Sequence, residues 1–207
     1  FCGLDCSLRI WEMDSWDRSQ FFDETGLPWI YPSPNMPMVE TAIIYPGMCL
    51  IEGTNISEGR GTTLPFHLFG APWINKQDLV DLIRIIAKEN DLQGCLFRAA
   101  TFEPRFQKHD GEVCHGIQIV VTDRTQLDPL LLGIVCLEAL YKENTERFEW
   151  RTETYEYVDD PIAIDLLFGC KEIREGLERG VSSRQLLLQM NAELDGFLEQ
   201  RATCLLY

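Results

Sequence analysis

One stretch of thirty residues, from Tyr45 to Ile74, constrains the fold more than any other part of this chain. It contains five glycines, a density that lets a backbone turn back on itself and approach a bound molecule closely. Apolar segments precede and follow its centre, so the polar residues between them are predicted to lie on a shaped loop held at both ends. These polar residues are Glu52, Thr54, Asn55, Ser57, Glu58, Arg60 and Thr62. The alternative is a purely structural loop whose charges pair internally.

The net charge of the 207 residues limits the kinds of partner that we expect. The chain has 33 acidic and 18 basic residues, a formal net charge of −15. A field of this sign repels phosphate backbones and anionic lipid surfaces, so we expect neither nucleic acid nor a membrane surface as a partner. No apolar run approaches the length of a membrane span. An anionic small molecule would need a local cation, and Arg60 is the candidate within the loop.

The eight cysteines do not follow a disulfide or metal pattern. None forms a CxxC pair, and Cys2 and Cys6 have a spacing that matches no common metal site. Most of the others lie in apolar runs such as GMCLI and IVCLEAL, which suits buried free thiols. We therefore expect free thiols, with a disulfide framework as the less favoured alternative.

Residues 75–207 are predicted to form a compact α+β domain. Asn75 and Asp128 are expected to cap helices that extend to about Asn90 and Tyr141. Strands are expected at residues 95–101, 116–122 and 148–157, and Ser182 or Ser183 is expected to cap a final helix that reaches about Arg201. The resulting order of elements, α-β-β-α-β-α, is typical of a compact two-layer domain.

Residues 1–74 contain too few regular elements to bury their many aromatic side chains. The opening segment DCSLRIWEMDSW is predicted to form a strand followed by a loop. Four prolines in TGLPWIYPSPNMP exclude regular helix and most sheet pairing, and we expect an ordered loop packed on a surface. A short helix or turn is expected at residues 39–44. We interpret residues 1–74 as the end of a larger α/β domain whose earlier strands are absent.

Two glutamates in the loop are candidates for acid and base chemistry. Glycosidases use a pair of carboxyl groups roughly 5 Å or 6.5–9.5 Å apart, for retention or inversion respectively. Glu52 and Glu58 lie six residues apart around glycines, so either separation is possible. Alternatively, one of them accepts backbone N–H groups within the loop.

Arg60 lies between two glycines, which leaves its guanidinium free to bind a carboxylate with both nitrogens. An internal ion pair with Glu52 or Glu58 is an equally good interpretation. The loop lacks the ending of a phosphate-binding P-loop and is not a GxGxxG turn after a strand. His109 and His115 flank acidic residues and a cysteine, but their spacing fits no common zinc site. We therefore expect no cofactor and no metal.

Three segments together resemble one family: TGLPWIYPSPNMP, YPGMCLIEGTNISEGRGTTLPF and GAPWI. The chain is similar to the exo-β-N-acetylmuramidases of the NamZ type. Later segments agree with this resemblance, namely FEPRFQKHDGEVCHGIQIVVTDR, WRTETYEY and FLEQRATCLLY. The likeness covers essentially the whole chain but only the later part of the family's sequence.

The resemblance implies a glycoside hydrolase that removes N-acetylmuramic acid from the non-reducing ends of peptidoglycan fragments, in the periplasm or outside the cell. It implies the C-terminal remnant of a Rossmann-like domain in residues 1–74 and a smaller α+β domain in residues 75–207. This piece is expected to be inactive without the upstream half of the Rossmann-like domain. Glu52 and Glu58 match motif positions and are the catalytic candidates. The candidates for substrate binding are Asn35, Thr54, Asn55, Ser57, Arg60 and His115.

Two alternatives of other classes stay open. A non-catalytic module that binds muramyl glycans would keep the loop without the catalytic acid. A domain that binds nucleotides or sugar phosphates would use a Rossmann-like remnant, although the missing phosphate loop disfavours it.

Overall fold

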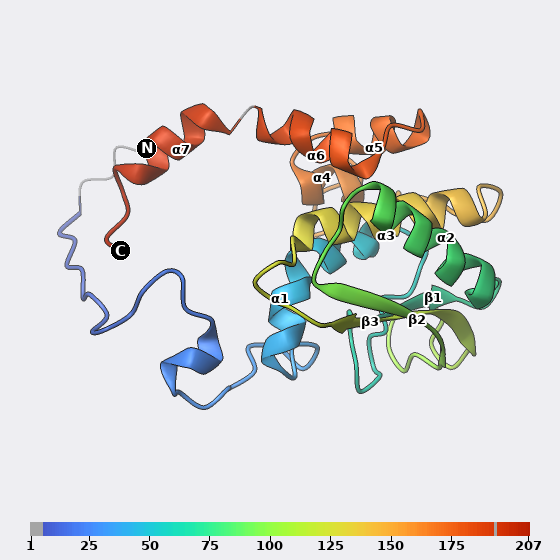
Figure 1. Cartoon of the computed structure of the whole chain (residues 1–207), viewed down its shortest axis with the longest axis horizontal. Coiled ribbons are helices and arrows are strands. Elements are labelled where there is room, and N and C mark those ends of the chain that lie inside the picture. Colours follow the sequence, from blue (N-terminus) through green and yellow to red (C-terminus); the bar gives the residue numbers. More distant parts are fainter. Residues whose placement is uncertain (1–5, 193) are drawn as a thin grey trace.

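The computed structural model describes residues 6–192 and 194–207. At its centre lies an antiparallel three-stranded sheet in the order β1-β3-β2 (Figure 1). The strands are β1 (Leu68–Ala71), β2 (Cys95–Phe102) and β3 (Cys114–Val121). Gly116 on β3 lies opposite Gly70 on β1 in this register. The chain is therefore a mixed helix and sheet protein, and two of its three strands are those expected from the alternating sequence.

Helices α2 (Lys76–Glu89) and α3 (Pro129–Glu143) lie over one face of the sheet (Figure 1). The side chains of Asn75 and Asp128 accept backbone N–H groups at the first turns of these helices, which confirms both predicted caps. α1 (Val39–Met48) packs across α3, where Gly47 and Gly133 face each other without room for a Cβ atom on either. The predicted short helix at residues 39–44 is thus confirmed, and it extends further than expected.

A third layer of short helices covers the far side of α3 (Figure 1). It consists of α4 (Ala163–Phe168), α5 (Glu172–Glu178) and α6 (Ser183–Asn191). Ser182 caps α6, as expected. The prediction of a single final helix was wrong, because α6 ends at Asn191 and a separate helix, α7 (Asp195–Ala202), follows it.

The strand predicted at residues 148–157 does not form. Its only bridges among the described residues are isolated ones, Thr54 with Trp150 and Tyr155 with Val158. The segment bends around the Gly-rich loop, and the backbone N–H of Arg151 donates to the carbonyl of Gly53 at 2.9 Å. A bent segment bonded at single points cannot build a ladder, so its alternating charges do not mark two sheet faces.

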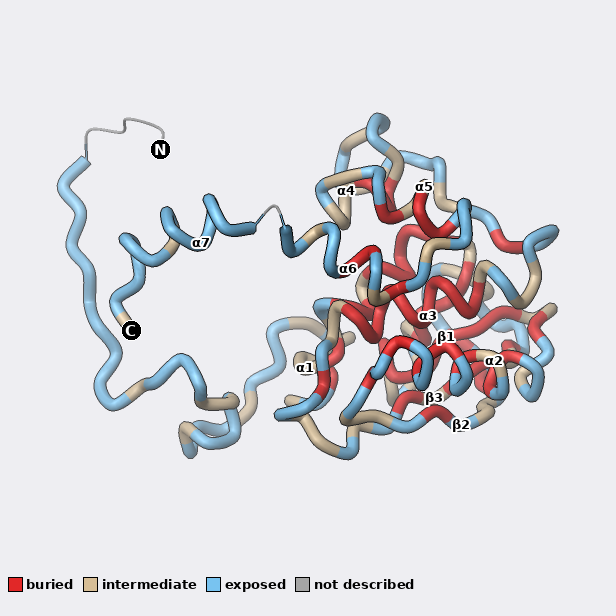
Figure 2. The backbone as a smooth tube through the Cα atoms, turned by 45° about the horizontal axis from the view of Figure 1, so that its top comes forward, coloured by how far each residue is buried: buried red, intermediate tan, exposed pale blue. Residues whose placement is uncertain are grey.

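We refer to residues 6–37 as the arm. The strand predicted near its start is absent from the described residues 6–16, and the arm contains only a short 3-10 helix, η1 (Phe22–Thr25). A strand needs a neighbouring strand to pair with, and no described strand pairs with this segment. The prediction of a proline-rich loop packed on a surface was also wrong, because Ile30 is 82% exposed. Figure 2 shows the arm as a mostly exposed tube beside α7, away from the buried core.

One hydrophobic core runs from Ile44 on α1 to Leu187 on α6. β1 lies before residue 74 and pairs with β3, which lies after it. The same sheet and core thus continue across the predicted domain boundary, and a division into residues 1–74 and 75–207 stays a prediction.

The cysteines in the described residues are free thiols: Cys6, Cys49, Cys95, Cys114, Cys136, Cys170 and Cys204. Burial raises the pKa of Cys95 and Cys114 to about 12, so both thiols are protonated at neutral pH. Cys2 lies outside the described residues. No helix in residues 6–192 and 194–207 has the length and apolar character needed to cross a membrane.

Candidate functional site

The Gly-rich stretch begins with a turn of helix. α1 passes directly into a 3-10 helix, η2 (Cys49–Gly53), so Glu52 lies on a helical turn and not on an irregular loop as expected. Beyond it the chain forms two single bridges, at Thr54 and at Ser57. Gly59 then has a φ of 73°, which L side chains rarely adopt. These constraints aim Glu52 and Glu58 at a common centre.

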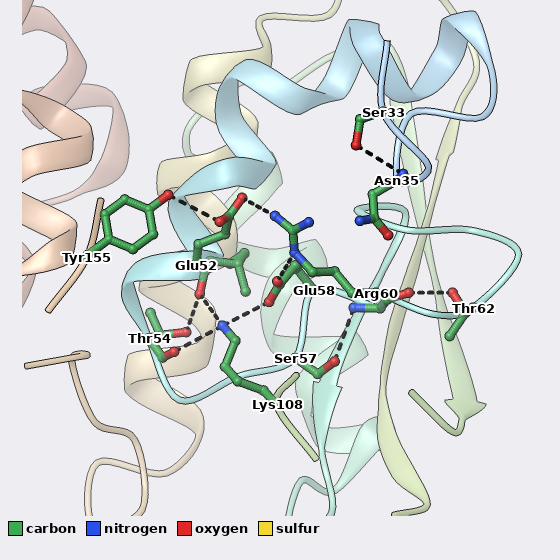
Figure 3. Close-up of polar contacts among 12 residues, drawn as sticks. Ser33, Asn35, Glu52, Thr54, Ser57, Glu58, Arg60, Thr62, Lys108 and Tyr155 are labelled. Atoms are coloured by element: carbon green, nitrogen blue, oxygen red, sulfur yellow. Dashed lines mark hydrogen bonds and ion pairs between the residues drawn. The ribbon is translucent and has the colours of Figure 1, made fainter. Parts of the chain in front are cut away.

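That centre is a group of five side chains, which we call the charge cluster: Glu52, Glu58, Arg60, Lys108 and Tyr155 (Figure 3). The guanidinium of Arg60 joins both glutamates, with Nη2 at 2.8 Å from Oε1 of Glu52 and Nε at 2.6 Å from Oε1 of Glu58. Lys108 lies 2.9 Å from the other oxygen of Glu58. The hydroxyl of Tyr155 donates to Oε2 of Glu52 at 3.2 Å. Two carboxylates and two cations therefore balance within one cluster.

Lys108 is held by three groups of the stretch. Its ammonium donates to the backbone carbonyls of Ile51 at 3.0 Å and Thr54 at 3.1 Å and forms an ion pair with Glu58. Its charge is therefore paired within the cluster. Its neighbours Gln107 and His109 both have positive φ values, so a strained turn carries this side chain into the loop.

The environment moves the pKa values of the two glutamates in opposite directions. Burial raises the pKa of Glu52, and the charge of Glu58 adds to this, although Arg60 acts against it. Burial would raise the pKa of Glu58 as well, but Lys108 and Arg60 outweigh it, and the pKa of Glu58 lies below its usual range. A carboxyl group with a raised pKa thus lies beside one with a lowered pKa, the pattern of an acid and a charged partner.

The cluster forms one wall of a cavity of about 500 Å³, a size suited to a small ligand. Glu52, Glu58 and Lys108 line it from the loop side. The opposite wall is the bent segment after α3, which includes Trp150 and Arg151. The remaining lining residues are Thr54, Asn55, Gln107, His109, Glu149, Thr152 and Glu153.

The structure brings some of the predicted substrate-binding residues to this cavity. Thr54 and Asn55 line it, although the Asn55 side chain is already bonded to the backbone of Arg147 and Glu149. Ser57 is buried and accepts the backbone N–H of Gly59. Arg60 forms the internal ion pairs that were the alternative interpretation, and it does not line the cavity.

Asn35 and His115 lie outside the cavity lining. The backbone of Asn35 bonds to Ser33 (Figure 3), and the ring of His115 lies 3.3 Å from Thr101 on the sheet. For these two residues a role in substrate binding stays a prediction.

Four residues of the charge cluster or the cavity lining were not among the predicted site residues: Lys108, Trp150, Arg151 and Tyr155. They come from the distant segments FQKHDGEVCHG and WRTETYEY, and the pairs Lys108–Ile51 and Tyr155–Glu52 join residues 57 and 103 positions apart. Both segments carry the family resemblance, which was the one signal able to find them. No local pattern marks either as a partner of the loop.

Within the described residues, no group of three or more His, Cys, Asp or Glu side chains is arranged so that it could hold a metal ion. His109 and His115 do not share a site. His109 bonds through Nε2 to the carbonyl of Asn55 at 2.9 Å and packs edge-on against Trp73.

Comparison with known proteins identifies a family. Residues 43–207 match the family model "Exo-beta-N-acetylmuramidase NamZ, C-terminal", and residues 2–40 match "Exo-beta-N-acetylmuramidase NamZ, N-terminal". A relative from Bacillus subtilis (strain 168), named peptidoglycan beta-N-acetylmuramidase NamZ, is 39% identical over 205 residues. The match covers 99% of this chain and 47% of the relative, so the chain spans about half the length of that protein.

Two solved structures, both of DUF1343 family proteins from Bacteroides fragilis NCTC 9343, share the fold. They superpose with TM-scores of 0.74 and 0.57 and cover 93% and 85% of this chain. The chain covers 48% and 43% of these two proteins. Each is 24% identical to this chain, so these likenesses concern the fold alone.

Proposed function

The chain belongs to the NamZ family of exo-β-N-acetylmuramidases, and from that premise we propose that its cavity takes part in hydrolysing terminal N-acetylmuramoyl groups of peptidoglycan fragments. One observation carries the proposal. Two carboxyl groups at a cavity of sugar size are held by a single guanidinium, and their pKa values move apart. Glycosidic bonds are cleaved by such pairs of carboxyl groups.

We assign different roles to the two glutamates. Glu52 lines the cavity, and its raised pKa suits a general acid that protonates the leaving oxygen. Glu58 has a side chain only 2% exposed, and both of its oxygens face cations. It therefore holds Arg60 and Lys108 in place, and direct attack on a sugar is the less favoured role.

The Rossmann-like remnant is also part of this proposal. The family's N-terminal model matches residues 2–40, and this region displays exposed apolar side chains such as Trp11 and Ile30. In a longer protein of the length of the relatives, these side chains would pack against the remainder of a Rossmann-like domain. That remainder is the partner that we expect for the arm.

A fusion protein tests the function. The half of the Bacillus subtilis relative that this chain does not match is joined to it, and turnover of a chromogenic N-acetylmuramide is followed over hours. We expect turnover by the fusion and none by the 207-residue chain alone, because a carboxyl pair needs a complete and rigid scaffold. Turnover by the short chain would show that the cluster suffices by itself.

In the fusion, Glu52→Gln removes the proposed acid and should lower the rate by about 10²- to 10⁴-fold. The rate should also fall as pH rises through the raised pKa of Glu52, because the acid must be protonated. Glu89→Gln, at the exposed end of α2, is the matched control. Full activity of Glu52→Gln would remove Glu52 from the mechanism.

A non-catalytic module that binds muramyl glycans is the second candidate. The observation in its favour is the charge balance of the cluster, where two cations already neutralise the two carboxylates. Tight binding of N-acetylmuramate by the fusion without any turnover would support this candidate over the hydrolase.

A further inference from the structure

The cavity contains an unequal set of charges. Four carboxyl groups line it, from Glu52, Glu58, Glu149 and Glu153. The cations among the lining residues are Lys108 and Arg151. N-acetylmuramate differs from N-acetylglucosamine by a lactyl ether on O3, which adds a carboxylate. A ligand with this charge must find a cation whose donors are not already used.

The contacts of the cations separate them. Lys108 forms an ion pair with Glu58 and donates to the carbonyls of Ile51 and Thr54. Arg60 pairs with both glutamates through Nη2 and Nε, and it does not line the cavity. Arg151 has five N–H groups, and within the described residues its guanidinium makes one hydrogen bond, from Nη2 to the carbonyl of Thr154 at 3.2 Å. It makes no ion pair with any described carboxylate.

Arg151 is nevertheless held in position. Its backbone N–H donates to the carbonyl of Gly53, the residue after Glu52. Its guanidinium lies over the ring of Tyr155, 5.1 Å from the ring centre. The hydroxyl at the other end of that ring bonds to Glu52. One tyrosine ring thus contacts both Arg151 and the proposed acid.

We propose that Arg151 is the specificity residue that binds the lactyl carboxylate of N-acetylmuramate while Glu52 faces the bond at C1. This inference rests on the proposed function and adds the residue that distinguishes muramate from glucosamine. An arginine with free donors can bind a carboxylate through two parallel hydrogen bonds, which a lysine cannot do. Arg151 lies at the same cavity as Lys108, and its charge adds to burial in lowering the pKa of Lys108.

Three ligands test the inference by calorimetric titration of the fusion protein: N-acetylmuramate, its methyl ester and N-acetylglucosamine. We expect the wild type to prefer the free acid. Arg151→Gln should weaken binding of the acid about ten- to a hundredfold and leave the other two ligands unchanged. Arg151→Lys should recover part of the loss. Arg179→Gln, an exposed arginine after α5, is the matched control.

Each contrary result has a separate meaning. Equal losses for all three ligands, or no loss for the acid, would overturn the role of Arg151 and leave the proposed function standing. A selective loss of the acid with Arg60→Gln but not with Arg151→Gln would assign the lactyl group to Arg60. Absence of binding of all three ligands by the wild type would overturn both this inference and the proposed function of the cavity.

Discussion

The arm and the Gly-rich stretch are both rich in apolar and aromatic residues, yet only one of them is buried. Trp11 in the arm is 89% exposed, whereas Phe66 and Phe69 in the stretch are 1% and 0% exposed. The stretch is enclosed by α1, by the sheet and by the turn that carries Lys108. The arm contacts the core mainly through Asp23 and Glu24, which pair with Arg124 at the surface. Apolar composition alone therefore does not determine burial, which depends on whether a packing partner is present.

The difference extends to the polar groups. In the stretch, the side chain of Glu58 is buried and both of its oxygens face cations. In the arm, ion pairs lie at the surface and are weakened by solvent and salt. The same kinds of residues thus determine the local structure in one region and contribute little in the other.

The largest expected effect comes from Lys108→Ala. It leaves Glu58 buried with one of its two cations, and breaking a buried pair costs about 3–5 kcal/mol. Urea unfolding followed by circular dichroism measures this loss. The surface variant Arg105→Ala, which breaks the exposed pair with Glu103, should change the free energy of unfolding by under about 0.5 kcal/mol. Equal losses of unfolding free energy for the two variants would contradict the view that the buried ion pair stabilises the fold more than the exposed one.

The same variant changes the response to acid. The pKa of Glu58 is lower in the folded protein than in the unfolded chain. Glu58 therefore stabilises the fold fully above its pKa in the unfolded chain, and this stabilisation is lost as the pH falls through its lowered pKa in the folded protein. Lys108 is a main cause of this decrease. The wild type should therefore lose more stability than Lys108→Ala on acidification. If the free energies of unfolding of the two proteins run parallel with pH, Arg60 alone lowers the pKa of Glu58.

Glycine substitutions provide a matched comparison between the two regions. Gly59 and Gly26 both have a φ of 73°. At Gly59 a Cβ atom would lie 2.6 Å from the carbonyl oxygen of Leu68, whereas at Gly26 nothing lies within 4 Å. We expect Gly59→Ala to cost about 2–4 kcal/mol from backbone strain and overpacking.

Gly26→Ala should change the unfolding of the core by under about 0.5 kcal/mol, because the arm is expected to unfold independently of it. Thermal unfolding of both variants provides the measurement. A comparable loss for Gly26→Ala would show that the arm and the core unfold together.

The smallest expected effect is that of removing residues 1–37. The urea midpoint of the core should stay unchanged within error, since few contacts link the arm to it. Binding of a hydrophobic dye should decrease, because exposed side chains such as Trp11 and Ile30 are removed. A lower midpoint, or unchanged dye binding, would mean that the arm packs on the core in solution.

Local chemistry made several elements predictable. Asn75, Asp128 and Ser182 cap helices because their side chains accept the first N–H groups of the helix, which requires only neighbouring residues. Both β2 and β3 were expected from the sequence, and β3 follows from its alternating, β-branched residues. The family, too, was recognisable from its motifs, and the comparisons confirm it.

The sequence by itself thus determined the main helices, two strands, the family and the presence of two glutamates and an arginine in one Gly-rich stretch. Only the tertiary structure decided how those charges are used. Folding pairs Arg60 with both glutamates of the stretch, burial raises the pKa of Glu52, and Lys108 from a distant segment helps to lower the pKa of Glu58. The physical reason is that burial and Coulomb interactions depend on distances in space, which residue spacing along the chain does not fix.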